Sequence, residues 1–102
     1  MKNILVVCSA GMSTSLLVNK MKETAEKKNI EVKIWAISEA EIKNHIDEAH
    51  IVLLGPQIRF MADKIRAVAG TKPVEVINMA DYGTMNGERV LNTALEKIGD
   101  AE

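Results

Sequence analysis

The feature that most constrains the fold is a set of four short runs rich in apolar and β-branched residues, each followed by a longer segment of helical periodicity. The runs cover residues 3–7, 31–35, 50–54 and 74–77. They lack a clean polar alternation, which is typical of parallel strands buried on both faces. The second and fourth runs keep some alternation, so we predict that they lie at the edges of the sheet.

The segments between these runs predict helices, because apolar residues recur at spacings of three and four. A Ser-x-x-Glu capping box and glycines at segment ends supply start and stop signals. The first helix is marked by the apolar row Leu17, Met21 and Ala25, and the second by the capping box at residues 38–41. The third is marked by the apolar stripe from Ile58 to Ala69, which Gly70 follows. Asn86-Gly87 marks the start of the last helix.

Strict alternation of strand and helix predicts an α/β fold, an open four-stranded parallel sheet with helices on both faces. A chain of 102 residues fits one such domain, residues 1–102. Ligands of these sheets bind beyond the carboxyl ends of the strands. Cys8, Gln57 and Tyr82 follow three different strands, so we expect them at this edge.

Composition excludes several classes of function. With 13 basic and 14 acidic side chains, three aromatic residues and no basic stripe, the chain does not resemble a nucleic-acid-binding protein. A single cysteine without a CxxC or HxxxH pattern argues against a metal site, and no cofactor motif is present. The lone cysteine and the lack of a run of ~20 apolar residues predict a soluble protein of the reducing cytoplasm.

The segment "CSAGMSTS" is the strongest candidate site. Small residues and Gly11 between a strand and a helix let backbone N–H groups turn inward, and the start of the helix adds unpaired N–H groups and a positive dipole end. Such a nest suits a tetrahedral dianion. The hydroxyls of the last three residues can assist, and one of them is expected to cap the helix. The predicted phosphate-binding residues are Ser9, Ala10, Gly11, Met12, Ser13, Thr14 and Ser15.

The same positive field favours the thiolate form of Cys8, which is the nucleophilic form. The alternative is an inert core thiol, the commoner state of a cysteine that ends a buried strand. Around it we expect Gln57, Ile58 and Tyr82 to form a rim that contacts a partner, although Tyr82 could equally be a half-buried ring that packs its own loop. Met12, at the apex of the loop, is also expected to face a partner.

Three segments carry a resemblance to a known family: "NILVVCSAGMSTSLLVNKM", "IVLLGPQIRFM" and "KPVEVINMADYGTMNG". They resemble enzyme IIB of the lactose/cellobiose (chitobiose) branch of the bacterial sugar phosphotransferase system, from Lys2 to Leu95. The resemblance implies that Cys8 takes a phosphoryl group from a phosphohistidine of a IIA protein. It then passes the group to a sugar, a β-linked disaccharide such as cellobiose, chitobiose or lactose, at the membrane permease IIC.

Further implications of the resemblance are a fold like that of low-molecular-weight tyrosine phosphatases and membrane association only through IIC. We also expect a monomeric chain, because no exposed apolar stripe in the sequence demands a partner subunit. Those phosphatases carry arginine in a C-x5-R motif, whereas this chain has Thr14 at that position and no Lys or Arg between Cys8 and Lys20. Without the arginine clamp, hydrolysis of a phosphocysteine should be slow. The sequence therefore favours a phosphoryl carrier over a cysteine-dependent phosphatase or a non-catalytic anion- or partner-binding module.

Overall fold

The computed structural model describes residues 1–9 and 12–99, the side chains of Met12 and Ser13 excepted. Its centre is one parallel sheet with the strand order β2-β1-β3-β4. The predicted sheet is confirmed, and so are its edges, because the second and fourth strands are outermost. The strands are β1 (Lys2–Cys8), β2 (Val32–Ser38), β3 (Ile51–Leu54) and β4 (Val74–Val76).

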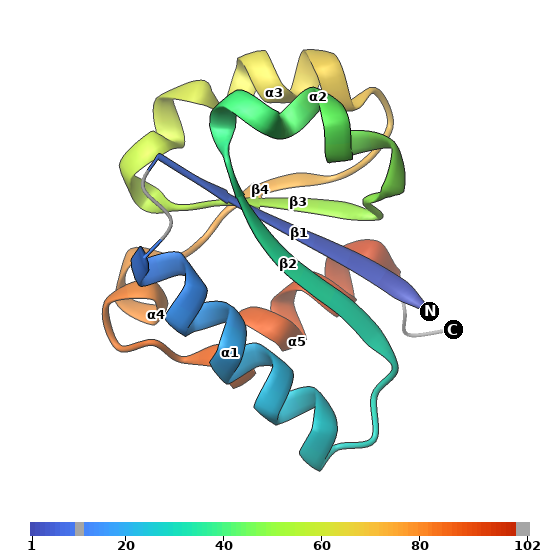
Figure 1. Cartoon of the computed structure of the whole chain (residues 1–102), viewed down its shortest axis with the longest axis vertical. Helices are drawn as coiled ribbons and strands as arrows, with labels where there is room; N and C mark the ends of the chain where they lie inside the picture. Colours follow the sequence, from blue (N-terminus) through green and yellow to red (C-terminus); the bar gives the residue numbers. More distant parts are fainter. Residues whose placement is uncertain (10–11, 100–102) are drawn as a thin grey trace.

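Helices cover both faces of the sheet, as predicted (Figure 1). One face carries α1 (Met12–Lys27), α4 (Met79–Gly83) and α5 (Gly87–Ile98). The other carries α2 (Ile42–His45) and α3 (Ala62–Ala69), together with the 3₁₀ helices η1 (Glu39–Glu41), η2 (Ile46–Glu48) and η3 (Pro56–Met61).

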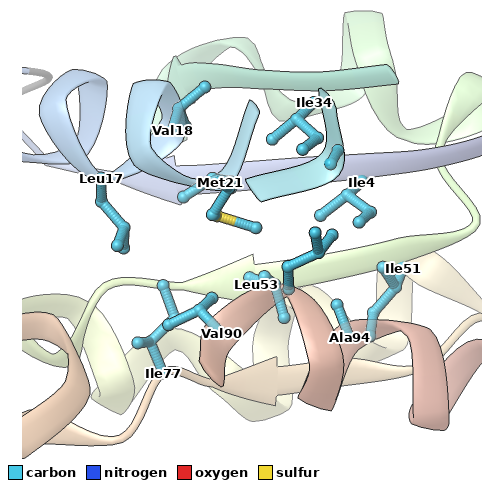
Figure 2. Close-up of a cluster of buried hydrophobic side chains, with 13 residues drawn as sticks. Ile4, Leu17, Val18, Met21, Ile34, Ile51, Leu53, Ile77, Val90 and Ala94 are labelled. Atoms are coloured by element: carbon cyan, nitrogen blue, oxygen red, sulfur yellow. The ribbon is translucent and has the colours of Figure 1, made fainter. Parts of the chain in front are cut away.

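The central strand β1 separates two cores. Ile4 and Val6 belong to the cluster shared with α1 and α5, which Figure 2 shows in part, whereas Leu5 and Val7 belong to the cluster under α2 and α3. All four side chains have no exposed surface. Successive residues of a strand point to opposite faces, so a strand covered on both sides needs an unbroken apolar run. This is the physical reason for the apolar sequence before Cys8.

The segment after β2 differs from the prediction of one helix beginning at a capping box. It folds as η1, the four-residue α2 and η2 instead. The Ser38 hydroxyl donates to the Glu41 carboxylate at 3.4 Å, and it makes no hydrogen bond to a backbone N–H. The backbone signal that would start an α-helix is therefore missing, although Ile46 is still buried.

Two helix starts also differ from the prediction. The stripe that begins at Ile58 opens with η3, where Ile58 has non-helical angles (φ −115°, ψ 25°), and regular α-helix starts only at Ala62. The first helix starts at Met12, earlier than its apolar row suggested. Thr14 and Ser15 therefore lie within the first turn of α1, so the expectation that a hydroxyl among residues 13–15 caps this helix is wrong.

Candidate functional site

Cys8 is the last residue of β1, at the carboxyl edge of the sheet. On one side it pairs in register with Ser38, the last residue of β2. On the other side lies Gly55, which directly follows β3 and donates its N–H to the carbonyl of Val7 at 2.9 Å. Cys8 is buried, with 2% of its surface exposed. The thiol therefore lies between two neighbouring strand ends, where ligands of such sheets bind.

Gly55 leaves room beside the cysteine. A Cβ atom built on Gly55 would lie 3.5 Å from the Cβ of Cys8 and 2.8 Å from Oε1 of Gln57. The side-chain amide of Gln57 thus folds over Gly55, on the side where Cys8 lies. The predicted position of Gln57 near the cysteine agrees with this geometry, and its side chain is able to donate or accept a hydrogen bond there.

The first turn of α1 provides the electrostatics of the site. This helix of 16 residues begins four positions after Cys8, and its first turn contains no acidic residue. Its first N–H groups lack partners within the helix, and no carboxylate of its own first turn offsets the positive end of its dipole. The arrangement favours an anion close to the end of β1.

Only part of the predicted phosphate-binding segment lies within the described residues. Ala10 and Gly11 lie outside the described residues, as do the side chains of Met12 and Ser13. Ser9 and Ser15 are described and exposed. Their roles in phosphate binding stay predictions.

Thr14 lies in the protein interior, although it was expected to offer its hydroxyl to a phosphate. Its side chain is fully buried, and its Oγ1 lies 3.3 Å from the hydroxyl oxygen of Tyr82 on α4. Tyr82 is half-buried, and its ring packs against the core cluster of α1 and α5. The hydroxyl of Thr14 thus contacts another part of the chain, and its role in phosphate binding stays a prediction.

A groove opens between η3 and α4, the two segments that follow β3 and β4. Its volume is about 510 Å³. Two apolar side chains in it are largely exposed, Phe60 at 79% and Met79 at 62%. Gln57 lines this groove and also lies beside Gly55 and Cys8, so the groove and the cysteine are neighbours. The lining residues are Pro56, Gln57, Arg59, Phe60, Met79, Tyr82 and Gly83.

The prediction that Ile58 contacts a partner is wrong, because this side chain is 2% exposed and belongs to the core under α3. The exposed apolar residue of η3 is Phe60, which the sequence analysis missed. A signal for it exists. Phe60 is an aromatic residue that falls outside the stripe of inward-facing residues, and such a side chain must point away from the sheet.

The two histidines have partners other than Cys8. His50 accepts a hydrogen bond from the N–H of Asn3 at the other end of β1, and His45 accepts one from the indole of Trp35. Over residues 1–9 and 12–99, no group of three or more His, Cys, Asp or Glu side chains is arranged to hold a metal ion. Within the same ranges, no helix combines the length and the apolar character needed to cross a membrane.

A family model and the curated relatives of this chain point to the same protein family. Residues 3–93 match the family model described as "PTS system, Lactose/Cellobiose specific IIB subunit". The chain is 43% identical over 97 residues to the oligo-beta-mannoside-specific EIIB component of Bacillus subtilis, covering 93% of this chain and 94% of that protein. It is 41% identical over 100 residues to both the galactose-specific and the cellobiose-specific EIIB components of Lactococcus lactis, covering 91% of this chain and 93% of each.

Solved structures agree with this comparison. The cellobiose-specific phosphotransferase IIB component of Borrelia burgdorferi superimposes with a TM-score of 0.81 at 44% identity, covering 97% of this chain and 93% of that one. The lactose-specific IIB component domain of Streptococcus pneumoniae gives a TM-score of 0.82 over 94% and 96% of the two chains. At 17% identity, the second match shows a common fold alone.

Proposed function

Since the chain belongs to the lactose/cellobiose-specific IIB family of the sugar phosphotransferase system, we propose that it is a phosphoryl carrier whose Cys8 receives the group from a phosphohistidine of a IIA protein. The observation that carries this proposal is the position of Cys8. It ends β1 between two strand ends, four residues before an α1 whose first turn has no acidic residue. Cys8 then donates the group to a sugar bound by the membrane permease IIC.

The proposed chemistry consists of two displacements at phosphorus. In the first, the sulfur of Cys8 forms an S–P bond while the N–P bond of the phosphohistidine breaks, and the imidazole leaves with the proton given up by the thiol. In the second, a sugar hydroxyl oxygen attacks phosphorus, the S–P bond breaks, and the hydroxyl proton returns to the sulfur. In this proposal the N–H groups of residues 9–15 hold the phosphoryl oxygens in both steps, because backbone N–H groups at the start of a helix stabilise negative charge.

A carrier must also keep water from taking the phosphoryl group. Cysteine phosphatases place an arginine where this chain has Thr14, and Thr14 is buried against Tyr82. The segment from Cys8 to Ser15 contains no cationic side chain. The phosphocysteine thus lacks the clamp that stabilises a hydrolytic transition state. We therefore propose that hydrolysis is slow while transfer between partners is fast.

The transported sugar is proposed to be a β-linked disaccharide such as cellobiose, chitobiose or lactose. The relatives are named for oligo-beta-mannosides, galactose and cellobiose at nearly equal identity. Overall similarity of the IIB chain therefore does not separate these sugars, and we assign the choice of sugar to the pocket of IIC. The chain would work in the cytoplasm, at the membrane only while it contacts IIC.

The proposal is tested by incubating the chain with a phosphorylated IIA protein and measuring intact mass. We expect the gain of one phosphoryl group on the wild type and no gain on Cys8→Ser. An equal gain on both chains, or none on the wild type, would contradict the proposal. Steady release of phosphate from an aryl phosphate would instead identify a phosphatase. An unmodified chain that still binds the IIA protein would identify a non-catalytic module.

A further inference from the structure

The hydroxyls of Thr14 and Tyr82 connect two parts of the chain that are 68 residues apart. Among the residues that the structure describes, Thr14 is the one polar side chain that is fully buried. Buried hydroxyls are normally hydrogen-bonded, because an unpaired one loses its bonds to water without replacement. The contact at 3.3 Å with Tyr82 therefore ties the first turn of α1 to α4.

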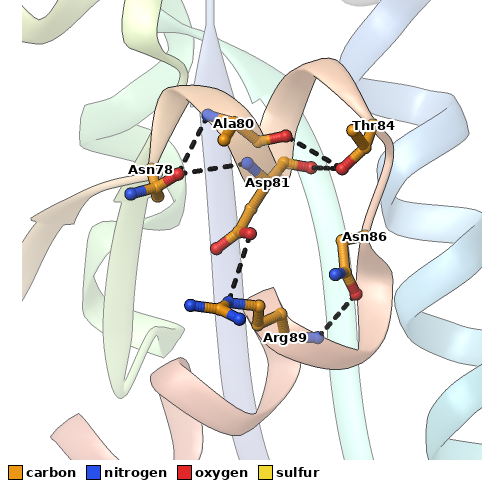
Figure 3. Close-up of polar contacts among 6 residues, drawn as sticks. All are labelled: Asn78, Ala80, Asp81, Thr84, Asn86 and Arg89. Carbon is orange, nitrogen blue, oxygen red and sulfur yellow. Dashed lines mark hydrogen bonds and ion pairs between the residues drawn. The ribbon is translucent and has the colours of Figure 1, made fainter.

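The helix that carries Tyr82 is itself held at both ends (Figure 3). At its start, the side chain of Asn78 accepts hydrogen bonds from the first N–H groups of α4 at 2.9 and 3.1 Å. At its end, the hydroxyl of Thr84 donates to a carbonyl of the same helix at 2.8 Å. An ion pair of 3.3 Å between Asp81 and Arg89 connects α4 to α5. Tyr82 is therefore carried by a helix whose two ends and whose position against α5 are fixed by hydrogen bonds and an ion pair.

The middle of α1 is fixed at a second point, on α5. Gly87 is the first residue of α5, and a Cβ atom built on it would lie only 2.5 Å from the carbonyl carbon of Lys20 and 2.7 Å from the backbone nitrogen of Met21. The backbones of α1 and α5 can approach this closely only because residue 87 has no side chain. The first turn of α1 and its middle are thus both located by the segment that follows β4.

We propose that Tyr82 is a positioning residue for phosphoryl transfer. Through Thr14 it sets the first turn of α1, so that the N–H groups of this turn face a phosphoryl group on Cys8. The inference rests on the proposed carrier function. It assigns the Tyr82 hydroxyl the role of positioning α1, in place of the predicted contact with a partner. Small displacements matter here, because an error of ~1 Å in the placement of catalytic groups can cost about 100-fold in rate.

The test compares Tyr82→Phe, Thr14→Val and the double variant with the wild type. The measured quantities are the maximal rate of Cys8 phosphorylation by a phosphorylated IIA protein and the IIA concentration that gives half of it. Each single variant should lower the maximal rate by roughly tenfold, with the half-saturating concentration unchanged. The double variant should be no slower than the slower single variant, because both changes remove the same hydrogen bond. Thr14→Ser restores the hydroxyl and should recover most of the rate that Thr14→Val loses.

A partner-free measurement separates this inference from the carrier function. Cys8 is treated with anionic iodoacetate and with neutral iodoacetamide, and the ratio of the two alkylation rates reports how well the first turn attracts an anion. Tyr82→Phe and Thr14→Val should lower this ratio, whereas Thr14→Ser should not. If Tyr82→Phe does not fold, as judged by circular dichroism, the Thr14→Val and Thr14→Ser pair carries the comparison.

Any of three results would overturn the positioning role. The first is a Tyr82→Phe variant whose phosphorylation rate and alkylation ratio equal those of the wild type. The second is a Tyr82→Phe variant with a raised half-saturating IIA concentration at unchanged maximal rate, and the third is a double variant in which the rate losses of the two single variants add up. The second result would show that Tyr82 contacts the partner instead. A wild-type chain that is never phosphorylated would contradict the carrier function, while a lowered alkylation ratio in the variants would still support the positioning role.

Discussion

At the scale of single residues, Gly55 sets the space available to the Cys8 thiol. Its backbone angles (φ −60°, ψ 146°) suit any residue, so a substitution there acts through volume and not through strain. Alanine would bring a Cβ into ordinary contact with Cys8, at 3.5 Å, and would displace only the flexible end of Gln57. Valine would add two methyl groups to this Cβ.

We therefore predict that Gly55→Val slows the phosphorylation of Cys8 by roughly tenfold or more, since it displaces the reacting groups. Gly55→Ala should slow the phosphorylation of Cys8 less than Gly55→Val does. Stopped-flow transfer from a phosphorylated IIA protein measures both rates, and alkylation by iodoacetamide shows whether access to the thiol changes in parallel. Equal rates for the valine variant and the wild type would show that Gly55 does not limit the site.

Single residues also show what the sequence could and could not predict. The position of Cys8 follows from the sequence, because an apolar strand followed by small residues places it at the carboxyl edge of a parallel sheet. The contact between Thr14 and Tyr82 does not follow. It depends on how α4 and α1 pack, and no local pattern encodes a meeting of residues so distant along the chain.

At the scale of elements, the close packing of α1 and α5 depends on one glycine. A Cβ at position 87 would meet backbone atoms of Lys20 and Met21 at 2.5 to 2.7 Å, and backbone cannot move aside as a side chain can. We predict that Gly87→Ala lowers the free energy of unfolding by about 1–3 kcal/mol, the usual cost of overpacking. Urea denaturation followed by circular dichroism measures the change.

Gly83 provides the matched control for this prediction. It lies in α4, and a Cβ built on it has no atom within 4 Å. Gly83→Ala should therefore leave stability unchanged or raise it by a few tenths of a kcal/mol up to ~1 kcal/mol, because alanine favours the helical backbone. A Gly87→Ala variant as stable as Gly83→Ala would mean that the two helices are not packed as described.

Strands were easier to predict than helix boundaries, and the reason is physical. Each strand of the sheet is covered on at least one face, and a buried strand needs a run of apolar residues that is easily seen in the sequence. The helix predicted after β2 relied on Ser38 and Glu41, but these side chains bond to each other and leave the backbone uncapped. The predicted start of the third helix, Ile58, lies in a kinked 3₁₀ segment, and α3 begins only at Ala62. Apolar periodicity alone does not distinguish a 3₁₀ turn from an α turn.

At the scale of the whole molecule, exposed apolar side chains gather beside the candidate site. Phe60 from η3 and Met79 from α4 both line the groove, and so does Arg59. Exposed apolar patches of this kind, rimmed by polar residues, mark interaction sites. A partner that delivers a phosphoryl group to Cys8 must cover this edge of the sheet, so we expect it to cover the groove as well.

We predict that Phe60→Ala raises the IIA concentration needed for half-maximal phosphorylation by about tenfold, because aromatic residues are enriched among the anchors of interfaces. Its stability should stay within ~0.5 kcal/mol of the wild type, as the side chain is largely exposed. Val68→Ala is the control. Val68 is also apolar and 45% exposed, but it lies near the end of α3 and does not line the groove. Equal effects of the two substitutions would exclude a docking role for Phe60.

The central claim is that Cys8 holds a phosphoryl group for transfer, and a chase experiment on the isolated phosphorylated chain tests it most directly. One sample is left in buffer, and another is mixed with membranes that contain IIC and a β-linked disaccharide, while phosphorus NMR follows the phosphocysteine signal. The account predicts that the signal persists in buffer and is lost to a sugar phosphate when the membranes are added. Loss to inorganic phosphate at the same rate in both samples would contradict it, because Cys8 would then be a hydrolytic nucleophile and not a carrier.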